Sequence, residues 1–176
     1  MPANTEDSTL NKLILLFIFD KMEMPLTEST IMDLCQNKNN WMDFVSCKFA
    51  LEQLVEAKFL VKMEGGKNET FYNITVQGRV CLAHFFVRIP STLRENITNY
   101  VKNSRMIYRR KQEYSSSYEK RDDGTYDVVL SITDTVMPAL EIKINVPNRN
   151  IAKHIDKHWG EKAPGIYAQL YDGLVE

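Results

Sequence analysis

Two histidines near the C-terminal end, His154 and His158, have the spacing of a metal-binding pair. Residues four apart lie on one face of a helix, so both imidazole rings can reach the same ion. The intervening residues 155–157 lack the glutamate of the zinc-protease motif, and no Cys or third His is close in the sequence. The pattern therefore favours a structural role, with His158 beside an apolar stripe that reaches Trp159, and it predicts no metal site.

A second group of side chains with binding chemistry lies between residues 105 and 114. It combines four cations with two tyrosines: Arg105, Arg109, Arg110 and Lys111 with Tyr108 and Tyr114. Rings that stack on bases and cations that neutralise phosphate are components of a nucleic-acid or anion site. From Met106 onward, however, tyrosines and charged residues alternate with a period of two, which predicts a strand with one solvated face. We prefer this ordinary interpretation.

The sequence contains none of the motifs that position catalytic groups. It lacks a Walker loop, a G-x-G-x-x-G turn and a G-x-S-x-G elbow, and no nucleophile has a recognisable base. We therefore expect that the protein is not an enzyme and uses no cofactor.

The composition is that of an ordinary globular protein, with 44% apolar and 26% charged residues in a chain of 176. This length favours two small modules. The longest apolar run, Leu13–Phe19, is far shorter than the roughly 20 residues of a membrane-spanning helix. No secretory signal pattern is present, so we expect a cytoplasmic protein without membrane contact. An odd number of cysteines without C-x-x-C spacing indicates reduced core residues, at Cys35, Cys47 and Cys81.

The first half of the chain has the periodicity of helices followed by a hairpin. Apolar spacing predicts a helix over residues 9–22 and a short second helix that Thr27 caps and residues 37–40 end. A third helix begins at Ser46 as its cap, or near Asn40 in the alternative, and extends past Val55. Strand-like runs at residues 59–63 and 70–75 flank the turn 65–68, and a fourth helix covers residues 76–87.

The first helix is apolar on more than one side. Leu10, Leu13 and neighbours supply the core of their own domain, which leaves Leu16 and Phe19 on another side. A second surface must then cover these two residues. We expect a homodimer interface there, with the C-terminal module as the alternative cover.

The second half predicts an antiparallel meander covered by helices. A helix capped by Ser91 comes first, a strand begins at Met106, and the turn at Asp122-Asp123-Gly124 leads to alternating runs near residues 126–132 and 140–146. Helices over residues 150–159 and 164–175 follow. The predicted fold is α+β, with an N-terminal winged helix-turn-helix over residues 1–90 and an α-β-β-β-α-α module over residues 91–176 for dimerisation or sensing.

The winged-helix assignment depends on a resemblance. The order of three helices, strand, turn and strand, with Pro25-Leu26-Thr27 and the run from Leu51 to Leu60, resembles bacterial winged-helix regulators of transcription. The whole chain is similar to a family of uncharacterised Gram-positive bacterial proteins, itself a domain of unknown function. This similarity includes residues 10–15, Met24-Pro25-Leu26-Thr27, Arg88-Ile89-Pro90 and Asn145-Val146-Pro147.

The resemblance implies that the third helix and the hairpin bind double-stranded DNA. In such regulators the third helix enters the major groove and the hairpin contacts the flanking backbone. The corresponding positions here are Ser46, Lys48, Phe49, Glu52 and Gln53 on the helix and Lys62, Lys67 and Asn68 on the hairpin. A two-fold dimer would suit a palindromic operator.

The net charge of the predicted DNA-binding half argues against DNA binding, so two alternative functions stay open. Residues 1–90 carry nine Lys or Arg and eleven Asp or Glu, a net charge of −2, whereas DNA affinity comes largely from cations on phosphates. The alternative is a scaffold for dimerisation or protein interaction that no longer binds DNA. A third possibility is a sensor for an unknown small-molecule effector, with a pocket lined by Tyr108, Tyr114 and Tyr126.

Overall fold

The chain forms two compact units of mixed α and β structure. The computed structural model describes residues 5–37, 39–65, 69–134 and 136–175. The first unit extends to Met106 and the second begins at Ile107, so the division falls within helix α5 (Ser91–Glu113). The boundary expected from the sequence lies earlier, at residue 90, where α5 is about to begin.

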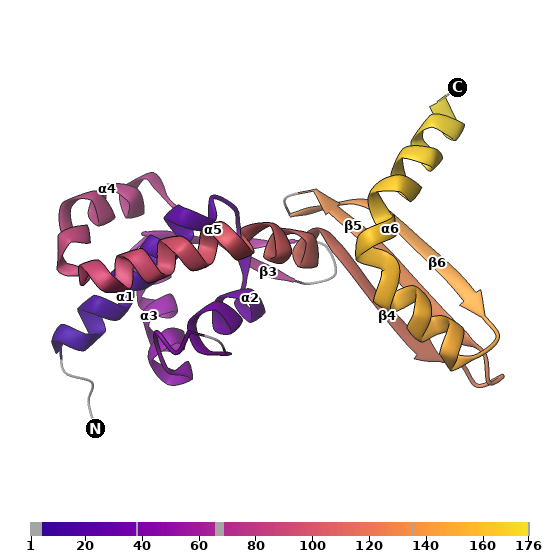
Figure 1. The fold of residues 1–176 in the computed structure, drawn as a ribbon, viewed down its shortest axis with the longest axis horizontal. Helices are drawn as coiled ribbons and strands as arrows, with labels where there is room; N and C mark the ends of the chain where they lie inside the picture. The colour runs from indigo at the N-terminus through magenta and orange to yellow at the C-terminus, as the bar shows by residue number, and fades with distance from the viewer. Residues whose placement is uncertain (1–4, 38, 66–68, 135, 176) are drawn as a thin grey trace. The chain divides into compact units, whose positions relative to one another are not determined.

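The first unit contains a three-stranded antiparallel sheet among helices (Figure 1). Its elements are α1 (Thr5–Met22), β1 (Leu26–Thr27), α2 (Glu28–Met32), the π-helical turn η1 (Asp33–Asn37), α3 (Phe44–Glu56), β2 (Leu60–Glu64), β3 (Thr70–Ile74), α4 (Val76–Phe85), the 3-10 turn η3 (Phe86–Arg88) and most of α5. The strand order is β1-β3-β2, so the central strand is the last of the three in sequence.

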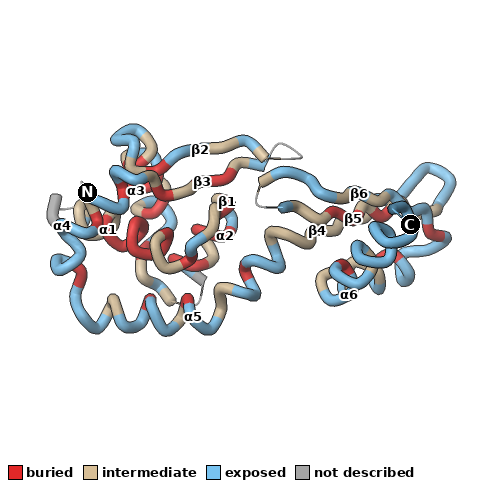
Figure 2. Tube along the Cα trace, turned by 90° about the horizontal axis from the view of Figure 1, so that it is seen from above, coloured by how far each residue is buried: buried red, intermediate tan, exposed pale blue. Residues whose placement is uncertain are grey.

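Helix α1 is the centre of the first unit. Every residue from Leu13 to Phe19 is buried (Figure 2), and α3, α4 and β3 pack around the helix. Leu16 is 1% exposed and Phe19 is fully buried within the single chain. The expected dimer interface at these two residues is therefore corrected: their own chain already covers both side chains, and the apolar circumference of α1 reflects a central helix.

Strand β1 is too short to be recognised by periodicity. Leu26 pairs with Tyr72 and Thr27 with Phe71 of β3. Thr27 also caps α2, because its Oγ1 accepts a hydrogen bond from Thr30 N at 3.3 Å. The predicted cap is confirmed. The same residue thus ends a strand and starts a helix, which fixes the path of the chain from the sheet into α2.

Helix α3 begins two residues earlier than its predicted cap. Asp43 is the N-cap, and its carboxylate accepts hydrogen bonds from Ser46 N at 3.0 Å and Ser46 Oγ at 2.6 Å. Ser46 is therefore the third residue of the helix rather than its cap. The helix ends near Lys58, which adopts a positive φ of 62°, and Phe59 N then donates to Leu54 O at 2.9 Å.

The second unit is a three-stranded meander with one helix across a face. Strands β4 (Tyr114–Lys120), β5 (Tyr126–Asp134) and β6 (Met137–Val146) are antiparallel in the order β4-β5-β6, and α6 (Arg149–Val175) follows. Gly124, at φ 84°, supplies the left-handed residue of the β4–β5 turn. The predicted meander is confirmed. Its core lies between the sheet and α6, and its buried members are Val128, Leu130, Val146, Ala152, Trp159 and Ala163.

Two predictions for the second half are wrong. Residues 106–113 continue α5 as helix instead of starting a strand, which leaves Met106 and Ile107 exposed. The two predicted C-terminal helices are one, with Pro164 inside α6. Proline removes a backbone hydrogen bond, yet Ala163 before it and Ile166 after it both pack against the sheet core. Packing on both sides of the proline keeps α6 continuous.

Candidate nucleic-acid interface

The outer face of α3 is solvent-exposed and contains apolar side chains. Phe44, Val45 and Phe49 are 48%, 73% and 52% exposed, respectively. The opposite face is buried, at Cys47, Ala50, Leu51 and Leu54. Helix α3 therefore buries one face in the first unit and exposes the other face to solvent.

Lys48, which the sequence places on this outer face, already has an ionic partner. Its Nζ lies 2.6 Å from Glu28 Oε1 at the start of α2. The hydrogen bond to Glu28 raises the pKa of Lys48, so the ammonium stays charged. Burial and the Glu28 carboxylate also raise the pKa of the neighbouring Tyr72. The charge of Lys48 is therefore balanced locally in the free protein.

Three further predicted positions on α3, at Ser46, Glu52 and Gln53, differ in their exposure and hydrogen bonding. Ser46 donates to Asp43, and this hydrogen bond lowers the pKa of the Asp43 carboxyl. Glu52 is exposed. Gln53 is half-buried, and its Oε1 atom is buried without a hydrogen-bond partner in the part of the chain that the structure describes. The outward orientation expected for Gln53 is therefore corrected, because its side chain lines a cavity on the inner side of α3.

The β2–β3 hairpin supplies one cation among the described residues predicted for the wing. Lys62 is exposed on β2, opposite Tyr72 of β3. The hairpin closes with Gly65 N donating to Glu69 O at 2.8 Å. Lys67 and Asn68, the other two predicted wing residues, lie outside the described residues.

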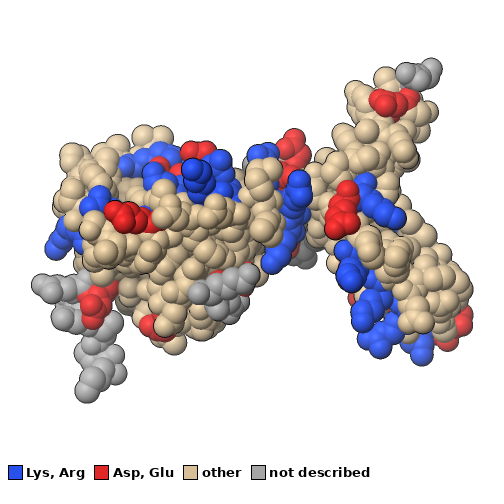
Figure 3. Space-filling model, in the orientation of Figure 1, with Lys and Arg blue, Asp and Glu red and all other residues tan. Residues whose placement is uncertain are grey.

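The surface of the first unit carries both signs of charge. Glu52 and Glu56 are exposed on α3 and Glu64 on β2, close in sequence to the predicted DNA-contacting cations. On the face drawn in Figure 3, basic and acidic groups lie side by side on this unit, and uncharged surface dominates. Any electrostatic attraction for an anionic partner must therefore come from a few local cations.

Comparison with known proteins places the chain in a family. Residues 11–174 match the family described as Domain of unknown function (DUF4364). The chain belongs to this family. The match includes residues of both units. No curated protein and no solved structure matches this DUF4364 chain.

Other candidate clusters of this DUF4364 chain are engaged in internal contacts. His158 Nδ1 lies 2.8 Å from His154 O, and the centres of the two imidazole rings are 4.2 Å apart. Within the described ranges, no three or more His, Cys, Asp or Glu side chains are grouped to hold a metal ion. In those same ranges no helix is both long and apolar enough to cross a membrane.

In the basic run of α5, Arg105, Arg109 and Lys111 have partners within the chain. Arg105 lies 2.8 Å from Glu23, and Arg109 lies 2.7 Å from Glu113 one helical turn away. Lys111 Nζ is 5.5 Å from the centre of the Tyr108 ring. The predicted solvated strand is therefore corrected to a helix, and these three cations contact acidic or aromatic neighbours. Tyr114 and Tyr126 pack against the core beneath α6.

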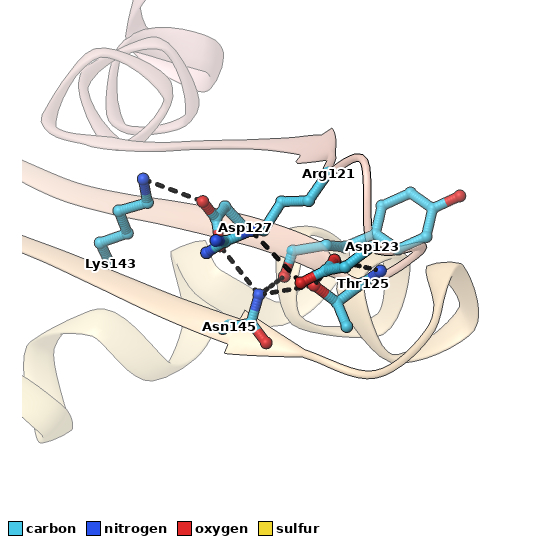
Figure 4. A network of polar contacts seen from close by, with 7 residues as sticks. Arg121, Asp123, Thr125, Asp127, Lys143 and Asn145 are labelled. Carbon is cyan, nitrogen blue, oxygen red and sulfur yellow. Dashed lines mark hydrogen bonds and ion pairs between the residues drawn. The ribbon is translucent and has the colours of Figure 1, made fainter.

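A polar network closes the β4–β5 end of the second unit (Figure 4). Asp127 lies 2.9 Å from Asn145 Nδ2, 2.9 Å from Lys143 Nζ and 3.4 Å from Arg121 Nη1. The hydrogen bonds from Asn145 and Lys143 lower the pKa of Asp127 from its ordinary value of 3.8 to about 2. Because its two basic partners neutralise Asp127, the network cross-links strands β5 and β6 instead of forming a cation site.

The lowered pKa of Asp127 predicts an acid dependence of stability. A carboxylate whose pKa falls on folding stabilises the native state above its unfolded pKa, near 3.8, and loses this contribution as pH falls toward about 2. The free energy of unfolding should therefore decrease across this window, and Asp127→Asn should flatten the decrease. Urea unfolding at a series of pH values measures both. An unchanged slope in the variant would show that other carboxyl groups cause the acid dependence.

Proposed function

We propose that the first unit is a winged-helix domain and that the chain regulates transcription by binding double-stranded DNA through α3 and the β2–β3 hairpin. The observation that supports this proposal is the order of the elements and the pairing of their strands. An exposed third helix leads directly into a two-stranded hairpin whose second strand pairs with the short strand before α2. This arrangement supports insertion of α3 into a major groove, with the hairpin on the adjacent backbone.

The side chains on this surface suit base contacts better than a dense phosphate clamp. Phe49 is 52% exposed and can pack on a thymine methyl group, and Glu52 can accept a hydrogen bond from a cytosine amino group. Lys62 on β2 supplies a cation for phosphate. We therefore expect modest affinity for random DNA and a larger share of binding energy from base edges.

Lys48 can bind a DNA phosphate only when its ammonium group leaves the carboxylate of Glu28. In the free protein its ammonium is paired with Glu28, with both side chains near 40% exposed, at 37% and 41%. An ion pair this exposed is worth about 1 kcal/mol or less, so a phosphate can replace the Glu28 carboxylate at small cost. Glu28 thus acts as a built-in competitor for the DNA backbone.

This exchange gives a specific prediction for DNA affinity. Glu28→Gln should raise affinity for a mixed-sequence duplex by up to about fivefold, because it removes the competing carboxylate. Lys62→Ala should weaken binding and reduce the slope of log affinity against log salt by about one. Fluorescence anisotropy across a potassium chloride series measures both effects. Lys153→Ala, which removes an exposed lysine of α6, is the matched control and should leave binding unchanged.

A second candidate function is a protein-interaction scaffold. It is favoured by the three large apolar side chains that α3 exposes, Phe44, Val45 and Phe49, since contiguous exposed apolar groups mark protein interfaces. A scaffold would show no salt-dependent DNA binding, and the Glu28 and Lys62 variants would behave like the parent. Absence of binding at low salt would therefore reject the DNA proposal and leave the scaffold. In either function, the second unit is proposed to support dimerisation or sensing.

A further inference from the structure

The last described turns of α6, residues 167–175, extend away from the sheet of the second unit (Figure 1). Ala152, Trp159 and Ala163 are the buried residues of this helix, and Ile166 packs against the sheet core. Every residue from 167 to 175 is exposed. These nine residues, the α6 extension, are therefore a helical segment that the sheet does not cover.

The α6 extension has the apolar periodicity of a helix that packs against another surface. Large apolar side chains at positions i, i+3, i+4, i+7 and i+8 share one face of a helix. The extension has all five, between 38% and 83% exposed, and they form the extension stripe: Tyr167, Leu170, Tyr171, Leu174 and Val175. The ring centres of the two tyrosines are 6.3 Å apart. A contiguous exposed apolar face of this kind marks an interaction site.

Helix propensity alone stabilises the α6 extension little. The preceding turns of α6 supply the nucleus, but each further residue of a helix in water adds only a small free energy. Gly173 lies inside the extension and lowers its propensity further. Most helical stability in proteins comes from packing of an apolar face. Burial of the extension stripe against a partner would supply that stabilisation.

The charge pattern favours a second copy of this chain as the partner. In a two-fold contact a patch meets itself, so a charge near the axis faces a like charge, which is unfavourable. The extension stripe contains no charged residue, and Asp172, the single charge among residues 167–175, lies outside the stripe, as does Gln169. Phe49 on α3, by contrast, lies one turn from Glu52. The stripe is therefore compatible with its own copy and offers no charge to an acidic or basic partner.

The exposed area of the stripe is sufficient for a dimer. A buried aromatic side chain contributes roughly 150–250 Å², and on this scale the exposed fractions of the five residues correspond to roughly 500–600 Å² in one copy. Two copies would bury roughly 1,000–1,200 Å², at the lower end of the range for specific interfaces. An interface of this size is consistent with a dissociation constant in the micromolar range.

We propose that the chain self-associates through the extension stripe, which packs against the same stripe of a second copy across a two-fold axis. The contact is an apolar pairing of two helices, and Tyr167 and Tyr171 are its largest side chains. A dimer of this kind carries two copies of α3 for two half-sites of an operator. That use rests on the proposed function, whereas self-association does not.

Sedimentation equilibrium of the full chain without DNA tests the proposal. At about 1–200 µM we expect a monomer–dimer equilibrium with a Kd on the order of 10 µM. Leu174→Glu places a charge in the stripe and should raise the Kd about tenfold or more. Gln169→Glu adds the same charge outside the stripe and, as the matched control, should change the Kd by about twofold or less.

A folding control separates lost association from misfolding. At about 1 µM, below the expected Kd, the chain is mostly monomeric and dimerisation adds little to stability. Urea unfolding at this concentration should therefore give the same midpoint for the parent, Leu174→Glu and Gln169→Glu.

Cysteine cross-linking identifies the surface that pairs. Tyr171 is at the middle of the stripe, so it lies near its own counterpart whether the two helices run parallel or antiparallel across a two-fold axis. Tyr171→Cys should therefore give a disulfide-linked dimer in oxidised glutathione, and mass spectrometry should find the link between the two copies of position 171. Gln169→Cys, outside the stripe, should cross-link no more than the parent chain, in which Cys81 is partly exposed.

Each outcome supports or overturns the interface. A monomer at every concentration overturns it and leaves the stripe to another protein or to the first unit. A dimer that Leu174→Glu leaves intact and that Tyr171→Cys does not cross-link overturns the stripe as the dimer surface. Because no DNA is present, neither result bears on DNA binding. Conversely, a chain that dimerises through the stripe and binds no DNA would keep this interface and reject only its use at an operator.

Discussion

Gly78→Ala should destabilise the first unit by about 2 kcal/mol or more, a cost typical of forcing an extra methyl group into a packed site. Gly78 lies in the first turn of α4, and a Cβ there would collide with the carbonyl oxygen of Phe59 and approach Ile74 Cγ1 to 2.9 Å. The Phe59 carbonyl cannot yield easily, because it accepts a hydrogen bond from Thr75 N at 3.0 Å. Either α4 or the turn between α3 and β2 must move.

Gly160→Ala is the matched control for this prediction. Gly160 is also inside a helix, but a Cβ there meets no atom within 4 Å. Its replacement should stabilise the chain by about 0.5–1 kcal/mol, because alanine loses less backbone freedom than glycine in a helix. Urea titrations followed by circular dichroism compare the two variants. If Gly78→Ala were as stable as Gly160→Ala, close packing of α4 on the α3–β2 turn would be refuted.

Trp159→Ala should cost about 3–5 kcal/mol in the second unit. The side chain is 2% exposed and lies in the core between α6 and the sheet. Its Nε1 donates to Ser131 O at 3.1 Å, so the residue joins α6 to the central strand β5 by packing and by a buried hydrogen bond. Chemical unfolding should show a clear loss of stability, and the variant should expose the apolar face of β5.

Two further variants separate the contributions of Trp159. Trp159→Phe keeps an aromatic ring but loses the buried hydrogen bond from Nε1 to the Ser131 carbonyl, so its cost should be smaller, about 1–3 kcal/mol. Tyr171→Ala removes an aromatic group of the same helix that is 56% exposed, and it should change stability by about 0.5 kcal/mol or less. Equal effects of Trp159→Ala and Tyr171→Ala would contradict the packing of α6 against the sheet.

Features encoded within a few neighbouring residues were predictable. The cap at Thr27 and the turn at Gly124 depend on local backbone geometry and hydrogen bonds, and both occur as expected. The meander was predictable because an antiparallel sheet with one solvated face alternates in hydrophobicity. The cap of α3 was misassigned because Asp43 and Ser46 are both good capping residues, and the sequence alone does not say which one accepts and which one donates.

Features that depend on distant residues were not predictable. Strand β1 contains only two residues and exists through its pairing with β3 more than forty positions later in sequence, at Leu26↔Tyr72. The helical state of residues 106–113 and the passage of α6 through Pro164 also contradict local patterns. For β1 and for α6, pairing with β3 and packing against the sheet outweighed the local preference.

For the candidate sites, the sequence by itself predicted a helix followed directly by a hairpin, the elements α3, β2 and β3, and identified them as the surface to test. Only the tertiary structure decided which sides of the helices face inward. It buried Leu16 and Phe19 in their own chain, turned Gln53 toward a cavity and paired Lys48 with Glu28. The physical reason is that periodicity records which residues share a face of a helix, whereas burial and charge pairing depend on elements that are brought together only when the chain folds.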